Sequence, residues 1–179
     1  MPPLRRVSTP AELRAARRLF EEYARSLPFA LDFQGFREEL DALPGEYAPP
    51  DGAILLAEDD DASSGADRSD ADASFAGCSF AGCVALRPLA APEADERRLC
   101  EMKRLYVRPA RRGRGIGRAL ADAVLDEARQ RGYDAMRLDT VAAMDAANAL
   151  YRALGFREIA AYRHNPLDAP VFFEKTLVS

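Results

Sequence analysis

The segment that decides the fold spans residues 99–131 and reads LCEMKRLYVRPARRGRGIGRALADAVLDEARQR. Residues 99–107 predict a strand that Pro109 ends, because proline has no backbone N–H to donate to a sheet. Residues 114–131 predict the best amphipathic helix of the chain, followed by Gly132. The apolar stripe of that helix consists of Ile116, Ala119, Leu120, Ala123, Val124 and Ala128. The segment therefore predicts a strand, a glycine-rich loop and a long helix in succession.

Three glycines, Gly113, Gly115 and Gly117, mark the loop between this strand and this helix. Glycine lets a backbone approach a ligand closely, and the first N–H groups of a helix have no partner within it. Together with the helix dipole and nearby arginines, these groups predict a pyrophosphate cradle. A tight turn without a ligand is the alternative. Position 118 is arginine, so the spacing is not Gly-x-Gly-x-x-Gly, and the loop has no Walker A lysine.

Basic residues are concentrated around the loop. The chain carries 25 basic and 29 acidic residues, for a net charge of −4. Residues 97–118 hold nine basic residues and only one acid, Glu101, so this window has a charge of +8 and the rest of the chain −12. This distribution predicts a compact anionic ligand and argues against nucleic acid, with a solvated arginine face as the alternative. The nine residues are Arg97, Arg98, Lys103, Arg104, Arg108, Arg111, Arg112, Arg114 and Arg118.

The other elements predict a single mixed α/β domain over residues 1–179, with one central sheet. Ser8 or Thr9 caps a first helix that runs to about Ser26, and Glu12 completes a capping box. Arg87 and Pro88 are expected to end the strand at residues 83–86. Further strands are expected at residues 4–7, 53–57, 136–141 and 171–177, and further helices at residues 33–43 and 143–154.

One segment does not fit this pattern. Residues 59–74 are too polar and too small-sided to join a core, so we expect a disordered acidic loop insertion at a hairpin tip. Residues 75–78 and 80–83 then repeat the sequence FAGC. The offset of five places the two copies on opposite faces of a strand, so only one phenylalanine can align with the core.

Composition narrows the class of protein. Apolar residues make up 48% and charged residues 30%, as in ordinary globular proteins. No apolar run approaches the ~20 residues of a membrane span, and the N-terminus lacks a signal-peptide pattern, so we expect a cytoplasmic protein without a membrane partner. Three cysteines without a CxxC pair and a single histidine argue for free thiols and against a metal site.

Three blocks in order resemble the GNAT N-acetyltransferase superfamily. The most specific is Arg112-Gly-Arg-Gly115-Ile-Gly117 at the start of the long helix. Leu105-Tyr-Val-Arg-Pro109 precedes it, and Asn148-Ala-Leu-Tyr151-Arg-Ala-Leu-Gly-Phe156 follows it. The resemblance is strong over residues 99–178 and rests on element order alone in the N-terminal half.

This resemblance implies a mostly antiparallel sheet with a V-shaped splay between two parallel central strands, flanked by about four helices. It also implies an enzyme that transfers an acetyl group from acetyl-CoA to a primary amine, by direct attack and without a metal. The resemblance leads us to expect a small molecule or a protein amine as the acceptor, and a monomer or a homodimer. The coenzyme would lie in the splay. Its expected contacts are Leu105, Tyr106, Val107, Arg112, Gly113, Arg114, Gly115, Ile116, Gly117, Arg118, Asn148 and Tyr151.

Two side chains carry the expected chemistry. Glu101 is the candidate base, with a carboxylate merely paired with Lys103 or Arg104 as the alternative. Tyr151 is the candidate acid for the leaving thiolate, with a core aromatic as the alternative. Asn148, one turn earlier on the same helix, is expected to point at the coenzyme with it.

Other functions and acceptors stay open at this stage. A non-catalytic coenzyme-A-binding or sensing domain would share the glycine loop. A covalent route through Cys100 is a further alternative, although no histidine lies near it in the sequence. Aromatic and acidic residues predict an acceptor surface for a cationic amine around residues 29–47 and 162–170. They are Phe29, Phe33, Phe36, Tyr47, Glu38, Glu39 and Asp41.

Overall fold

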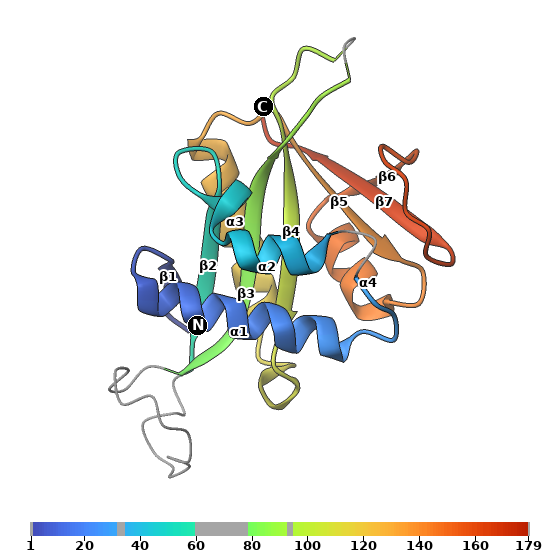
Figure 1. The fold of residues 1–179 in the computed structure, drawn as a ribbon. Coiled ribbons are helices and arrows are strands. Elements are labelled where there is room, and N and C mark those ends of the chain that lie inside the picture. Colours follow the sequence, from blue (N-terminus) through green and yellow to red (C-terminus); the bar gives the residue numbers. More distant parts are fainter. Residues whose placement is uncertain (1, 32–34, 60–78, 93–94, 179) are drawn as a thin grey trace.

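A computed structural model describes residues 2–31, 35–59, 79–92 and 95–178 of the chain. Within these residues, seven strands form one sheet in the order β1-β2-β3-β4-β5-β7-β6, and four α-helices pack on it (Figure 1). All neighbouring strands are antiparallel except β4 and β5, which are parallel. The predicted mixed fold is therefore confirmed. The strands are β1 (Leu4–Arg6), β2 (Ala53–Glu58), β3 (Phe80–Leu89), β4 (Leu99–Val107), β5 (Ala135–Val141), β6 (Arg157–Ile159) and β7 (Pro170–Thr176). The helices are α1 (Pro10–Ser26), α2 (Phe36–Ala42), α3 (Ile116–Gln130) and α4 (Asp145–Ala153), with 3-10 turns at Gly45–Tyr47 and Pro109–Arg111.

The first helix begins as its sequence predicts. The Thr9 hydroxyl accepts a hydrogen bond from the backbone N–H of Glu12 at 3.2 Å. The Glu12 carboxylate accepts one from the backbone N–H of Thr9 at 3.0 Å, which completes the capping box. This pair satisfies two N–H groups that the helix itself leaves without partners.

Three elements differ from the prediction. α2 begins at Phe36, after Gly35 in a left-handed conformation, rather than at residue 33; residues 32–34 lie outside the described residues. β3 continues through Pro88 to Leu89, whereas the sequence predicts that the strand ends at Arg87 and Pro88. Pro88 is tolerated because β2 pairs with β3 only as far as Leu86, which leaves β4 as the single neighbour there. The three-residue strand β6 is too short to leave a periodic signal.

The predicted insertion falls almost entirely outside the described residues. Only Asp59 of residues 59–74 is described, and the first FAGC copy, residues 75–78, is not. The second copy opens β3, where Phe80 is buried under α1 and α2. Gly82 of this copy is required by close packing, because a Cβ there would lie 2.4 Å from the carbonyl oxygen of Tyr106.

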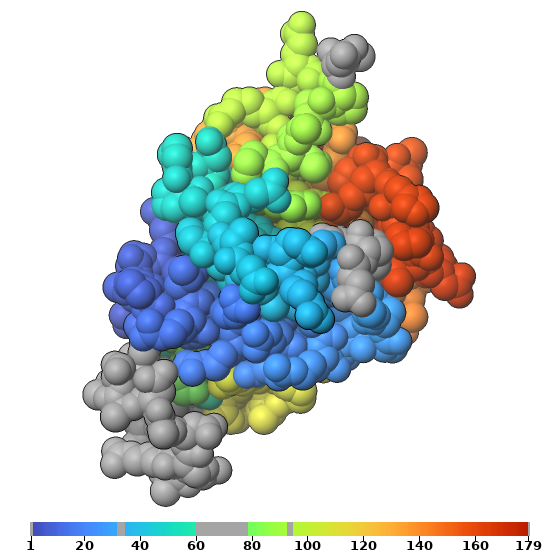
Figure 2. All heavy atoms as spheres, in the orientation of Figure 1, coloured from blue at the N-terminus to red at the C-terminus, as the bar shows by residue number. Residues whose placement is uncertain are grey.

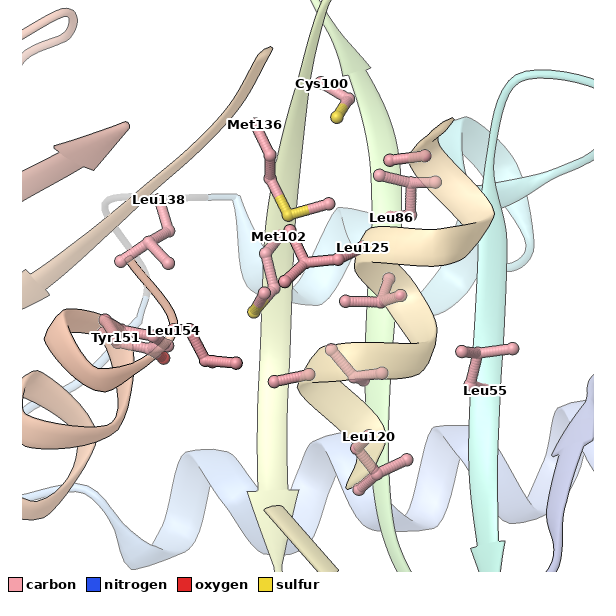
Figure 3. Packing of buried hydrophobic residues seen from close by; sticks show 14 of the residues in the cluster. Leu55, Leu86, Cys100, Met102, Leu120, Leu125, Met136, Leu138, Tyr151 and Leu154 are labelled. Atoms are coloured by element: carbon pink, nitrogen blue, oxygen red, sulfur yellow. The ribbon is translucent and has the colours of Figure 1, made fainter. Parts of the chain in front are cut away.

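Each face of the sheet carries its own apolar layer. α3 and α4 cover one face, where Met102, Leu138 and Tyr151 belong to one cluster (Figure 3). α1 and α2 cover the other face and pack side by side on it (Figure 2), over a cluster that includes Phe20 and Tyr106. Alternation along the strands supplies both layers, since successive side chains point to opposite faces. No helix among the described residues is both long and apolar enough to cross a bilayer.

The two parallel strands separate soon after they meet. β4 pairs with β5 only from Leu99 to Glu101, opposite residues 135–137. Beyond this point the strands diverge (Figure 1). β4 also contains a bulge, where Arg104 has a φ of 57° and the register with β3 shifts. The predicted V-shaped splay is thus present, and β5 does not pair with the end of β4.

Candidate active site

A cavity of about 740 Å³ lies where β4 and β5 separate. Residues 102–107 of β4 form one wall, and residues 138–141 of β5 form the opposite wall. The loop before α3, the N-terminal part of α4 and the end of α1 complete the lining. The remaining lining residues are Tyr23, Ser26, Leu27, Pro28, Phe29, Leu31, Arg111, Arg112, Gly113, Gly115, Ile116, Gly117, residues 143–147, Leu150, Tyr151, Asn165 and Leu167.

The glycine loop has the backbone that a phosphate cradle requires. Gly113 and Gly115 have φ values of 76° and 79°, which side chains other than glycine rarely adopt. A Cβ at either position would project into open space, with no described atom within 4 Å. Gly115 caps α3, so the N–H groups of the first helical turn point out of the helix without internal partners. The loop can therefore receive an anion from the cavity.

Most of the predicted coenzyme contacts lie together on the cavity wall. Eight loop and strand residues line it as expected, namely Leu105, Tyr106, Val107, Arg112, Gly113, Gly115, Ile116 and Gly117. The side chains of Arg114 and Arg118 do not belong to the lining, and Arg118 instead pairs with Asp122 at 2.8 Å.

The positive charge of residues 97–118 is largely neutralised by acids from other parts of the chain. Seven of the nine basic residues pair with a carboxylate, so the isolated window overstates the positive charge at the cavity. Exposed Arg112 instead donates from Nε to the carbonyl of Val107 at 3.0 Å. The seven pairs are Arg97–Glu174, Arg98–Asp51, Lys103–Asp139, Arg104–Glu39, Arg108–Glu22, Arg111–Asp59 and Arg118–Asp122.

Tyr151 reaches the cavity from α4. Its ring packs against Phe156 and Phe173, with centroids 5.9 and 6.0 Å away, and is directed from α4 toward β4 (Figure 3). The side chain is nearly buried, yet within the described residues its hydroxyl makes no hydrogen bond. Burial raises the pKa of Tyr151 above its usual value, so the phenol stays protonated. The ring therefore packs in the core, as the alternative interpretation expects, and the residue also lines the cavity. Its role as an acid stays a prediction.

Asn148 does not point at the cavity, in contrast to the prediction from helical spacing. Its amide donates to the carbonyls of Val141 and Ala142 at 3.0 and 3.3 Å. These bonds attach α4 to the end of β5. Asn148 therefore positions α4, and so Tyr151, from behind the cavity wall.

Glu101 lies outside the cavity lining and is completely buried. Strand alternation turns it toward the face covered by α1 and α2, where other groups surround its carboxylate. Arg87 donates to it at 2.9 Å and the Tyr162 hydroxyl at 2.7 Å, and Arg163 pairs with it at 2.5 Å. The geometry favours the alternative of a paired carboxylate. The expected partners Lys103 and Arg104 instead pair with other acids.

Cys100 offers no site for a covalent route. It faces the core on the α3 side, and burial raises the pKa of its thiol above the usual range. It does not line the cavity. A thiol that stays protonated and out of reach is a poor nucleophile.

The sequence missed two charged residues on opposite walls of the cavity. Lys103 of β4 and Asp139 of β5 both line it, and their Nζ and Oδ1 atoms lie 3.4 Å apart. Burial, the largest effect, lowers the pKa of Lys103 to about 8. Burial acts to raise the pKa of Asp139, but the charges of Lys103 and Arg163 bring it below its usual value. The sequence offered one signal for Lys103, because the chain contains only two lysines and one of them lies in the strand that lines the cavity.

Two groups of polar atoms show whether the cavity walls suit a coenzyme whose amide groups form hydrogen bonds. The edge of β4 after Glu101 faces β5 without pairing to it, which leaves backbone groups there for a ligand. The Thr140 hydroxyl on the opposite wall is buried and has no partner within the described residues. A bound chain with amide groups would satisfy both, so the residues present fit a pantetheine arm.

Few of the residues expected at an acceptor surface line the cavity. Phe29 lines the cavity, as do Asn165 and Leu167 of the segment before β7. Phe36 and Tyr47 do not line it: the Phe36 ring packs against the Arg104 guanidinium at 5.0 Å, and Tyr47 is buried in the core. Glu39 and Asp41 pair with Arg104 and Arg17, Glu38 is not a lining residue, and Phe33 lies outside the described residues.

The profile of the Acetyltransferase (GNAT) family matches residues 16–156, which is most of the chain. The chain belongs to the GNAT acetyltransferase family. It is thus an acyltransferase that depends on acetyl-CoA. The glycine loop and the block around Tyr151 are two of the three local features that made the resemblance visible in the sequence.

Individual GNAT relatives agree with this assignment. An uncharacterised N-acetyltransferase of Schizosaccharomyces pombe is 32% identical over 166 residues, covering 93% of this chain and 89% of the relative. A GNAT-family acetyltransferase structure from Staphylococcus aureus matches 98% of this chain and 100% of its own, with a TM-score of 0.68 and 18% identity. Arabidopsis thaliana NAA60 in complex with acetyl-CoA matches 98% of each chain, with a TM-score of 0.64 and 18% identity. At such identity the two structures show a shared fold.

Proposed function

We propose that this GNAT protein transfers the acetyl group of acetyl-CoA to a primary amine by direct attack in a ternary complex. One observation carries the proposal: β4 and β5 separate after three paired residues, and the opening has the glycine loop at one end and Tyr151 on its wall. Acetyl-CoA supplies an acetyl thioester, which an uncharged amine can attack. A binding domain without catalysis would have no need of a phenol in this opening whose hydroxyl has no partner among the described residues.

In this proposal the chain holds the coenzyme mainly through its backbone. The β5-facing edge of β4 from Leu105 to Val107 receives the pantetheine arm like an added strand. The N–H groups of residues 112–118 receive the pyrophosphate at the start of α3. Exposed Arg112 adds a positive charge next to them. The pairing of most other arginines with acids leaves this backbone cradle as the principal anion site.

Tyr151 is proposed as the proton donor to the leaving sulfur. The phenol is protonated at physiological pH, and its hydroxyl has no competing partner among the described residues. Burial disfavours the thiolate in the same way as it disfavours the phenolate, so the two remain comparable in basicity. Glu101 is proposed as a positioning residue that holds Arg163 and Tyr162 against the sheet.

The proposed acceptor enters from the α1 side. Tyr23, Phe29 and Leu31 line that part of the cavity, opposite Asn165 and Leu167. NAA60 of Arabidopsis thaliana has been solved with a bisubstrate analogue, and the NatC complex with a Gag peptide and CoA. These neighbours suggest peptide amines as acceptors for the first tests, alongside free amino acids and small amines.

The experiment is thiol release from acetyl-CoA across a panel of amines, with mass spectrometry of the products. The expected result is amine-dependent thiol release together with an acetylated product. Isothermal titration calorimetry with CoA is the parallel measurement of binding. CoA binding without transfer to any amine in the panel would favour a non-catalytic coenzyme-binding domain, and absence of CoA binding would refute the site itself.

A further inference from the structure

Lys103 stands out from the other basic residues of the chain. Of 25 basic residues only Lys103 and Lys175 are lysines, and the other 23 are arginines. Lysine can lose its proton when it is buried, whereas arginine stays charged in proteins. Lys103 is 6% exposed and lines the cavity, whereas Lys175 in β7 is half-buried and does not. The chain thus places its one buried lysine where the proposed reaction occurs.

Lys103 and Tyr151 approach the opening from opposite faces of the sheet. Met102 and Leu138 belong to the layer under α3 and α4, as does Tyr151. Strand alternation therefore turns their neighbours Lys103 and Asp139 toward the face of α1 and α2. An amine that enters from the α1 side meets Lys103 and Asp139 before it reaches the opening. A group that leaves on the other side meets Tyr151.

We propose that Lys103 is the base that removes a proton from the ammonium group of the acceptor, and that Asp139 positions its Nζ atom. This inference rests on the proposed function, because it assigns a residue to amine acetylation. Asp139 is well placed for this task. It accepts hydrogen bonds from Lys103 at 3.4 Å and from Asn165 at 3.0 Å, and it also pairs with Arg163.

The proton balance is complete with these residues. The acceptor ammonium carries three protons, and neutral Lys103 takes the first. The resulting amine forms a bond to the acetyl carbon while the bond from that carbon to sulfur breaks. The departing sulfur receives a proton from the Tyr151 phenol. The second proton of the nitrogen then passes to the phenolate and restores the phenol. The third proton stays on the amide product. Lys103 then releases its proton to solvent through the cavity.

The charges that face Lys103 come from three elements. Glu101 lies on the same strand and Asp139 on β5, and both act to raise its pKa. Arg163, before β7, and Arg104, next in sequence, act to lower it. Burial exceeds all of these and brings the pKa to about 8. At neutral pH roughly a tenth of the molecules would hold the free amine, which suits a general base.

The first test measures Lys103 without turnover. Protein labelled with ε-13C-lysine should give two lysine side-chain signals, and Lys103→Arg identifies one of them. The Lys103 signal should titrate near pH 8, and Asp139→Asn should move that midpoint lower because it removes a negative charge. The Lys175 signal serves as the internal control for labelling and for sample integrity. A Lys103 midpoint above about pH 10 would overturn the proposal.

The second test is the pH dependence of transfer. Lys103→Arg keeps the charge and Lys103→Met keeps the length, so both should lower kcat/KM for the amine by about 10²–10⁴-fold and remove the inflection near pH 8. Lys175→Arg should match the wild type, and all three variants should bind CoA with the wild-type Kd. Wild-type rates and an unchanged inflection in either Lys103 variant would refute the role of Lys103 as the base, but would leave the proposed acetyl transfer standing. Absence of CoA binding or transfer in the wild type would refute the proposed function and this inference with it.

Discussion

Substitution of Tyr151 by phenylalanine separates catalysis from packing. The ring contacts with Phe156 and Phe173 remain, and only the hydroxyl is lost. Because that hydroxyl has no hydrogen-bond partner among the described residues, the free energy of unfolding should change by less than the ~1 kcal/mol of an average hydrogen bond. If the phenol protonates the leaving sulfur, turnover should fall by a factor of roughly ten to a thousand, which is about 1.4–4 kcal/mol of transition-state stabilisation.

Tyr133→Phe provides the matched control. The Tyr133 hydroxyl donates to the carbonyl of Asp51 at 2.9 Å and lies outside the cavity lining. Its loss should cost about 1 kcal/mol, which lowers Tm by roughly 2–4 °C in a domain of this size, without changing turnover. The two variants should therefore show opposite patterns, one in rate and the other in stability.

The assay is single-turnover acetyl transfer at saturating acetyl-CoA, because slow product release would mask a slower chemical step in the steady state. Differential scanning fluorimetry gives Tm, and calorimetry gives the CoA Kd. Tyr151→Phe with wild-type single-turnover rates would show that Tyr151 is a core aromatic only. A large fall in Tm would show that the hydroxyl has a structural partner, and the rate could then no longer be read as proton donation.

Two glycines and one lysine offer further tests. Gly115→Ala should cost about 1 kcal/mol of stability, because alanine rarely adopts the positive φ of this position. Calorimetry should show CoA binding weakened roughly tenfold. Unchanged affinity would exclude the loop as the pyrophosphate cradle. Gly82→Ala brings a Cβ to 2.4 Å from the Tyr106 carbonyl, so Tm should fall by several degrees, and an unchanged Tm would contradict the close packing of β3 on β4. For Lys103, whose pKa falls from 10.5 to about 8 on folding, the unfolded chain binds the extra proton between these pH values, so folding stability rises with pH. Urea unfolding should show the wild type gaining up to about 3 kcal/mol over Lys103→Met between pH 8 and 10.5, and a constant difference would contradict the shift.

The sequence predicts best where the signal is local. The capping box of Thr9 and Glu12 and the apolar stripe of α3 each depend on residues three or four apart, and both were predicted correctly. The glycine loop is also local, because Gly113 and Gly115 mark backbone that other residues adopt only with strain. These features were sufficient to place the glycine loop that lines the cavity before α3.

Predictions that depended on distant partners were less complete. Glu101 was the candidate base, with a carboxylate paired with Lys103 or Arg104 as the alternative. Its partners include instead Arg87 and Arg163, which reach it from β3 and from the segment before β7. Residues 97–118 have a charge of +8 in the sequence, but the acids that neutralise most of it come from several other elements and lie far away in the sequence. Lys103 was counted as one of these charges and as a possible partner of Glu101. Its burial and its contact with Asp139 depend on where β4 and β5 separate.

The bulge at Arg104 explains how one strand can serve both sides of the reaction. Without it, strict alternation would place Leu105 on the same face as Lys103, and Tyr106 on the face of Met102. In the structure Tyr106 instead packs under α1 and α2, while Leu105 and Val107 pack against the layer of α3 and α4. A non-glycine residue with a φ of 57° costs about 1–2 kcal/mol, and Arg104 is held there by its bidentate pair with Glu39 and by the face of Phe36. A strand that served only the fold would have no reason to retain this strain. Its position, between the proposed base and the edge that would receive the pantetheine arm, ties the strain to the chemistry of the cavity.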